Sequence, residues 1–146
     1  MLKVTPIMIF TGQANQAIKL YEKAFGAEVK VKLLFSDMHS DDWQCSDEEK
    51  DMVAHSEIKI GGNIVMLADD ATNLSDTVVQ KKPAKSFSID LLVNFDSDNE
   101  LKAAYEVLSD GATVTDPLCS TTYCSLCVTL IDKYGGRWQL MSGYAG

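Results

Sequence analysis

The residues of this chain best suited to chemistry are a histidine and a glutamate two positions apart, His55 and Glu57. Apolar and polar residues alternate along segment 52–60, which is typical of a β-strand. Alternate residues of a strand point to the same face, so the two side chains lie side by side. An imidazole beside a carboxylate can act as a general base. The alternative, a histidine that only bonds a neighbour in a half-buried sheet, is favoured where no nucleophile or metal partner is apparent. Both interpretations stay open.

The four cysteines are the next candidates, because Cys124 and Cys127 have the Cys-x-x-Cys spacing of a zinc or redox pair. Their neighbours predict a strand over 121–131, however, and residues i and i+3 of a strand point to opposite faces. No Gly, Pro or Asn lies between the two thiols to form a turn. We therefore expect all four, Cys45 and Cys119 included, to be reduced and partly buried thiols without a metal or redox role.

Composition excludes several classes of function. The net charge of −8 argues against nucleic acid as a partner, since phosphate binding needs clustered Lys and Arg. No apolar run is long enough for a transmembrane helix, and the N-terminus lacks the pattern of a signal peptide. We expect a cytoplasmic protein with neither a nucleic-acid nor a membrane partner.

Acidic residues gather in the polar segment Ser36–Lys50 and just after it. A segment of this length is long for a connection inside a compact domain, which indicates a mobile or ligand-facing loop. A solvated loop that keeps the protein soluble is the favoured interpretation. The alternative is an acidic rim that attracts a cationic ligand.

One design occurs twice in the chain. The Gly61-Gly62 and Gly135-Gly136 pairs are each followed by one polar residue and an apolar run, which is typical of a β-hairpin. Helical spacing of apolar residues precedes each hairpin. The first half is predicted as strand 3–10, helix 13–25 and strands 28–35, 52–60 and 63–68, and the second as strand 87–95, helix 100–109 and strands 113–115, 121–131 and 137–141.

These elements predict an α+β fold made of two tandem β-α-β-β-β modules. The first module spans 1–70, the linker 71–85 and the second module 86–146, within one domain of 146 residues. Each module would form a curved mixed sheet, and pairing of the modules would enclose a cleft between the sheets.

The motifs that carry a family resemblance cover nearly the whole chain. They include Thr5-Pro6, Phe10-Thr11-Gly12-Gln13-Ala14, Phe25-Gly26-Ala27, Val53-Ala54-His55-Ser56-Glu57-Ile58, Gly61-Gly62 and Asp132-Lys133-Tyr134-Gly135-Gly136-Arg137-Trp138-Gln139-Leu140. With them the chain resembles the glyoxalase, bleomycin-resistance and extradiol-dioxygenase (vicinal oxygen chelate) superfamily, in its PhnB-like branch. The resemblance implies a small-molecule ligand and a homodimer. Members of the branch have been labelled ubiquinone-pathway methyltransferases, but no glycine-rich cofactor loop follows the first strand here.

The resemblance also implies where a divalent metal would bind, because metal-using members take one ligand from the first and last strand of each module. Carried over, these positions fall on Pro6, Val65, Ser88 and Gln139. Pro and Val offer no lone pair, Ser little, and Gln only a weak neutral oxygen. We therefore expect no metal site and no cofactor.

Two hypotheses about function remain. The first is a binder that sequesters a small molecule, with Ser88, Tyr123, Trp138 and Gln139 near the mouth of the cleft as candidate ligand-binding residues. The second is an enzyme of lyase, isomerase or dioxygenase type. It would use His55 with Glu57, or a metal site rebuilt from Gln139 and His55.

Overall fold

The computed structural model describes residues 2–38, 45–70 and 88–144. The chain divides into two compact units, residues 1–82 and 83–146, which we call unit 1 and unit 2. Residues 39–44 of the predicted acidic loop, with His39, Asp41 and Asp42, lie outside the described residues. The predicted linker 71–85 lies outside them as well.

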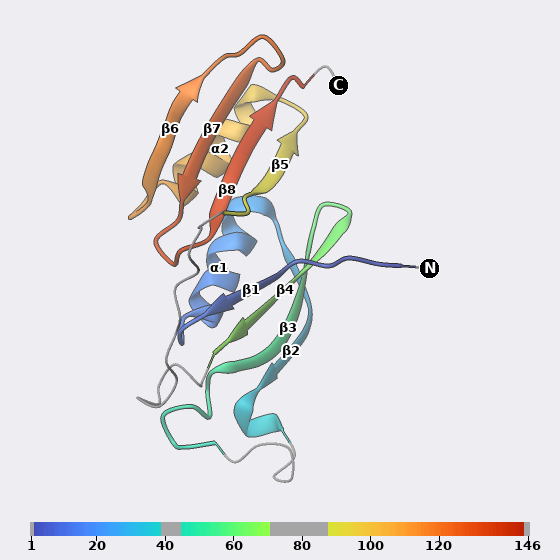
Figure 1. Ribbon diagram of the computed structural model, residues 1–146, viewed down its shortest axis with the longest axis vertical. Helices are drawn as coiled ribbons and strands as arrows, with labels where there is room; N and C mark the ends of the chain where they lie inside the picture. Colours follow the sequence, from blue (N-terminus) through green and yellow to red (C-terminus); the bar gives the residue numbers. More distant parts are fainter. Residues whose placement is uncertain (1, 39–44, 71–87, 145–146) are drawn as a thin grey trace. The chain divides into compact units, whose positions relative to one another are not determined.

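Unit 1 is a four-stranded mixed sheet with one α-helix (Figure 1). The sheet has the order β1-β4-β3-β2, in which β1 and β4 are parallel and the other pairs are antiparallel. The elements are β1 (Ile7–Phe10), α1 (Ala14–Phe25), β2 (Glu28–Leu34), the 3-10 helix η1 (Phe35–Asp37), β3 (Val53–Ile60) and β4 (Asn63–Asp69).

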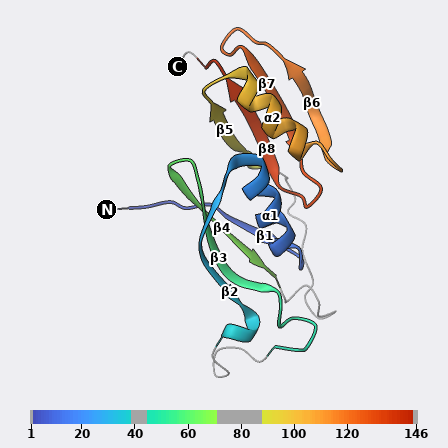
Figure 2. The same ribbon diagram turned by 180° about the vertical axis from the view of Figure 1, so that it is seen from behind.

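Unit 2 repeats this arrangement, with the sheet order β5-β8-β7-β6 and a parallel pair formed by β5 and β8. Figures 1 and 2 view the molecule from opposite sides and place α2 behind and in front of this sheet, respectively. The elements are β5 (Leu91–Phe95), α2 (Asp98–Leu108), β6 (Thr113–Cys119), β7 (Leu126–Ile131) and β8 (Arg137–Ser142). The predicted α+β fold of two β-α-β-β-β modules is confirmed.

Each core lies between one face of a sheet and the helix of the same unit. Apolar residues of α1 are buried with Ile58 and Leu67, and those of α2 with Leu130, Trp138 and Leu140. The buried residues of the helices recur with the predicted helical spacing: Ala14, Ala17, Ile18 and Tyr21 in α1, and Leu101, Ala104 and Leu108 in α2. The helix of each unit lies on one face of its sheet, and we call the opposite face the helix-free face of that unit.

A buried carboxylate joins three elements of unit 1. The Asp69 side chain accepts hydrogen bonds from the backbone N–H groups of Gly12 (2.9 Å), Ala14 (3.0 Å) and Val53 (2.9 Å). It thereby caps α1, whose own N-cap residue Gln13 forms no side-chain cap. In unit 2 the residue before α2 supplies the cap itself, because the hydroxyl of Ser97 accepts from the Glu100 N–H.

Strand β1 is less buried than its run of apolar residues, 7–10, indicates. Ile7 and Ile9 are 52% and 55% exposed, while Phe10 is buried. Such a run is consistent with a buried strand, but α1 covers only one face of the sheet and β1 lies at its edge. Its isoleucines consequently belong to the helix-free face.

Strict alternation along the predicted strand 52–60 would place Val53 on the same face as His55, but the structure does not. Leu33 pairs with His55 but Leu34 pairs with Val53, so β3 holds one extra residue between the two pairs. Such a β-bulge shifts the alternation of side chains by one position. Val53 is therefore fully buried together with Ile58, while His55 is half-buried.

Two strands of unit 2 differ in length from the prediction. β6 continues to Cys119 through Pro117, which an edge strand with a bulge tolerates. β7 begins only at Leu126, because 120–125 forms a loop in which the Thr121 hydroxyl accepts from the backbone N–H of Tyr123. Such side-chain bonds compete with a strand ladder.

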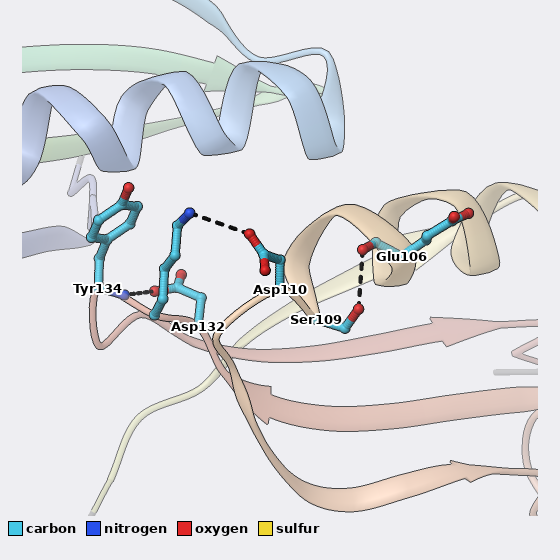
Figure 3. A network of polar contacts seen from close by, with 6 residues as sticks. Glu106, Ser109, Asp110, Asp132 and Tyr134 are labelled. Carbon is cyan, nitrogen blue, oxygen red and sulfur yellow. Dashed lines mark hydrogen bonds and ion pairs between the residues drawn. The ribbon is translucent and has the colours of Figure 1, made fainter.

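The turn between β7 and β8 is organised by Asp132 (Figure 3). One carboxylate oxygen accepts from the backbone N–H groups of Tyr134 (2.8 Å) and Gly136 (3.0 Å). The other accepts from the indole N–H of Trp138 at 2.8 Å. Figure 3 also shows Asp110 beside the turn, where its carboxylate lies 3.6 Å from the Lys133 ammonium.

The Asp69 contacts predict a large loss of stability on truncation. Asp69→Ala leaves three backbone donors without their acceptor, so we expect the free energy of unfolding to fall by about 3 to 5 kcal/mol. Urea denaturation followed by circular dichroism measures this. The control is Asp110→Ala, which removes an exposed ion pair worth about 1 kcal/mol or less. Equal effects of the two substitutions would contradict the structural role of Asp69.

Candidate functional site

The structure brings His55 and Glu57 together on the helix-free face of unit 1. Their Nε2 and Oε1 atoms are 3.6 Å apart, and the two side chains are 37% and 30% exposed. This distance exceeds a hydrogen bond but allows an ion pair when the imidazole is protonated. The pair is thus partly shielded from solvent and still accessible to a ligand.

Apolar side chains flank this pair across the sheet, and Lys59 follows it along β3. Glu57 lies between Val31 on β2 and Met66 on β4, and Ile7 is the next residue along the same row. Leu33 on β2 pairs with His55 and is 41% exposed. An exposed apolar surface with one polar pair at its centre is typical of a surface that binds an apolar partner or ligand.

The helix-free face of unit 2 carries a more polar row. Gln139 on β8 lies between Leu92 on β5 and Thr129 on β7. At the start of β8, the Arg137 guanidinium donates to Asp90 at 2.8 Å. Gln139 is the one predicted ligand-binding residue that the described strands place on this face.

The other three predicted ligand-binding residues lie elsewhere. Trp138 is 1% exposed and belongs to the core on the α2 side of the sheet, with its indole N–H bonded to Asp132. Tyr123 lies in loop 120–125 and is 49% exposed. Ser88 is exposed and precedes β5. The structure therefore does not bring Trp138 and Gln139 to the same face.

The carried-over metal positions do not all lie opposite one another: beside Met66 and Gln139 the first strands of the modules place Ile7 and Leu92, not Pro6 and Ser88. The resemblance implies that Val65 and Gln139 are equivalent positions of the two modules. However, Val65 is buried on the α1 side of its sheet, whereas Gln139 lies on the helix-free face of unit 2. The equivalent of Gln139 is Met66, because Ile7 pairs with Met66 as Leu92 pairs with Gln139. Two aliphatic side chains, a thioether and an amide are a poor donor set for a divalent ion. Within the part of the chain that the structure describes, no group of three or more His, Cys, Asp or Glu is placed to hold a metal ion.

A cavity opens beside α1 and is lined in part by Glu48, from the segment that was expected to be a mobile or ligand-facing loop. It measures about 610 Å³ and lies between α1, β2 and residues 48–52, with Lys19 and Lys32 opposing Glu48 and Asp51. Asn15 donates to the backbone carbonyl of Asp51, and its Oδ1 is buried without a partner. The two lysines and the two acidic residues that line the cavity balance in charge, so the cavity favours neither a cationic nor an anionic ligand. Pattern reasoning indicated the loop and missed the cavity itself, because the cavity forms where a helix, a strand and a loop meet.

Loop 120–125 is fastened to the end of β8 through Ser125. Its hydroxyl donates to the Asp98 carboxylate at 2.6 Å, which also accepts from the Ser142 hydroxyl. These two hydrogen bonds, that of Ser125 first, hold the pKa of Asp98 below its usual value. Gly143 permits this close approach, since it has φ +64° and a Cβ there would lie 2.2 Å from the Ser125 Oγ.

The loop also changes the interpretation of the Cys-x-x-Cys pair. Cys124 belongs to the loop and Cys127 to β7, so the prediction that they point to opposite faces of one strand is wrong. Both are buried and form one cluster with Met141. Their burial agrees with the prediction, whereas Cys119 is exposed and contradicts it.

A sequence model of the family described as 3-demethylubiquinone-9 3-methyltransferase matches residues 2–141. The chain belongs to this family. No curated protein matches it.

Several solved structures share the fold of this chain. Protein PA1353 from Pseudomonas aeruginosa is 22% identical with a TM-score of 0.78, and covers 97% of this chain and 98% of its own. The putative 3-demethylubiquinone-9 3-methyltransferase, PhnB protein, from Bacillus cereus is 21% identical with a TM-score of 0.72, at 97% and 99% coverage. A glyoxalase/bleomycin resistance protein/dioxygenase from Nocardioides is 14% identical with a TM-score of 0.54, at 100% and 87% coverage. The chain shares its fold with these proteins, which include a PhnB protein and a glyoxalase/bleomycin resistance protein/dioxygenase. None of the helices in the described ranges is long and apolar enough to cross a lipid bilayer.

The Asp98 contacts predict a pH-dependent contribution to stability. Because the pKa of Asp98 is lowered on folding, its contribution is present above the unfolded pKa of about 3.9 and is lost as the pH falls through the folded value. Asp98→Asn should therefore lower the urea midpoint at pH 7 and match the original chain in strong acid.

The matched control is Asp96→Asn, which removes the same charge two residues earlier. We expect no change in the urea midpoint at either pH. A constant effect of Asp98→Asn across the acid range would contradict a role for the ionised carboxylate.

Proposed function

We propose that this protein binds, and thereby sequesters, a small apolar molecule with a cationic group on the helix-free face of unit 1, without a divalent metal. The observation that carries the proposal is the His55–Glu57 pair among exposed aliphatic side chains. The aliphatic residues remove the apolar body of the ligand from water. The Glu57 carboxylate accepts a charge-assisted hydrogen bond from its cation.

Electrostatics support the choice of a cation. The net charge of −8 attracts cationic ligands at long range, and at the site a carboxylate stands between apolar neighbours. The poor metal donor set at Ile7, Met66, Leu92 and Gln139 favours binding over metal-dependent catalysis.

A metal-free enzyme is the second candidate, favoured by the 3.6 Å separation of the His55 and Glu57 side chains. In this case His55 would take a proton from the substrate, and Glu57 would stabilise the imidazolium that forms. Elemental analysis of the purified protein separates both candidates from a metalloenzyme. One tightly bound divalent ion per chain would contradict both.

We also propose that the protein is a homodimer, as the family resemblance implies. Strands β1 and β2 form the edges of one sheet, and β5 and β6 those of the other. Edges with unpaired backbone groups are commonly covered by another chain. Light scattering should give twice the chain mass of 16.0 kDa, and a mass of one chain at high concentration would contradict a dimer.

Binding is tested with the aromatic cations ethidium and rhodamine 6G, and with the anion fluorescein as a probe of similar size. Fluorescence anisotropy gives each Kd. We expect the cations to bind more tightly than fluorescein. Glu57→Gln should weaken cation binding by about tenfold, which corresponds to about 1.4 kcal/mol, because it removes a charge-assisted hydrogen bond.

Glu22→Gln is the matched control, since it removes the same charge from an exposed position on α1. Cation affinity should stay as in the original chain. The proposal fails if no cation binds, or if Glu22→Gln and Glu57→Gln weaken binding equally.

A further inference from the structure

We propose that Cys119 and Cys127 are a modification site, a thiol pair that is reversibly oxidised to a disulfide joining β6 to β7. The two residues face each other in the antiparallel ladder, and their Sγ atoms are 3.7 Å apart. This inference concerns unit 2 and holds whether or not the helix-free face of unit 1 binds a ligand.

The backbone geometry suits a disulfide. Residues directly opposite each other in an antiparallel pair have Cα atoms about 4.5 to 5.5 Å apart, within the usual disulfide range. The sulfur atoms need to approach by less than 2 Å to reach a bond length of about 2.05 Å. Because directly opposite side chains share a face, rotation of the two side chains suffices.

A bulge in β6 creates this juxtaposition. Asp116 pairs with Thr129 and Cys119 with Cys127, so β6 advances one residue more than β7 between the two pairs. Without the extra residue, Leu118 would oppose Cys127 and Cys119 would point to the other face. The bulge at Pro117–Leu118 therefore selects the cysteine as the partner of Cys127.

The two thiols differ in a way that orders the reaction. Cys119 is exposed, whereas Cys127 is buried. Burial first, and then contacts with the thiols of Cys119 and Cys124, raise the pKa of Cys127 to about 12. An oxidant in solution consequently meets Cys119 first, and Cys127 is the resolving thiol.

The chemistry balances with a disulfide oxidant such as oxidised glutathione. The Cys119 thiolate attacks one sulfur of the oxidant, which forms a mixed disulfide and releases one glutathione. The Cys127 sulfur, after loss of its proton to water, then attacks Cys119 Sγ and releases the second glutathione. Two protein thiols are oxidised to one disulfide, and one glutathione disulfide is reduced to two thiols.

Cys124 is the competing partner of Cys127. It is buried in the same cluster, and its Sγ lies 3.1 Å from the Thr121 hydroxyl. Since Cys124 is anchored in loop 120–125 and shielded from solvent, we assign it to packing. Cys45 belongs to unit 1 and serves as the internal reference.

The test is oxidation of the reduced full chain by millimolar oxidised glutathione, followed by acid quenching, thiol counting and peptide mapping. We expect the thiol count to fall from four to two in the original chain, with a peptide containing the Cys119–Cys127 disulfide, and to return to four with dithiothreitol. Cys124→Ser and Cys45→Ser should each retain the disulfide. Cys119→Ser, an exposed substitution that leaves the core intact, should abolish it.

Three results would overturn the proposal. They are a Cys124–Cys127 disulfide in the original chain, stable glutathione adducts without any intramolecular disulfide, and an intramolecular disulfide that persists in Cys119→Ser.

Discussion

Each four-stranded sheet of this protein has one helix to cover it, and the rest of the structure depends on this constraint. A single helix can bury one face, so the side chains on that face form the core and those on the other must serve a different purpose. In unit 1 the alternation of β3 buries Ser56 and Ile58 while it presents His55 and Glu57. The pairing of β1 with β4 adds Ile7 and Met66 to the same surface.

The two modules share this frame but fasten it differently. At the end of β4, Asp69 reaches the start of α1 and the start of β3. At the equivalent end of β8, Ser142 donates to Asp98 in the first turn of α2. In the first module the last strand supplies the acceptor, and in the second module it supplies the donor. In both modules the contact joins the last strand to the N-terminus of the helix. Duplication has preserved the connection and not the residue types.

The order of elements was predictable because its signals are local. Glycine pairs mark the hairpins, and apolar residues recur with helical spacing in α1 and α2. The register of the strand pairs was not predictable, because it depends on the lengths of the turns and on β-bulges. A two-residue turn joins Ile60 to Asn63, whereas residues 132–136 separate Ile131 from Arg137. Alignment on the glycine pairs consequently misplaces the face of β4 by one residue.

The candidate site was predictable to the same extent. The spacing of His55 and Glu57, two residues apart on one strand, is a local feature of the sequence, and their side chains do lie together. The cavity beside α1, and the opposition of Cys119 to Cys127, both depend on contacts between elements that no sequence period encodes. The position of Trp138 could not be predicted for the same reason. It lies under α2 because the register of β8 turns its side chain toward the helix.

The central claim is that the helix-free face of unit 1 is the ligand surface. The most direct measurement is the change in backbone amide chemical shifts of the ¹⁵N-labelled chain during titration with rhodamine 6G. The account predicts the largest changes at Val31, Glu57 and Met66, which share one row of the sheet. Changes confined to Gly12, Asn15 and Lys19, beside the cavity at α1, would contradict it.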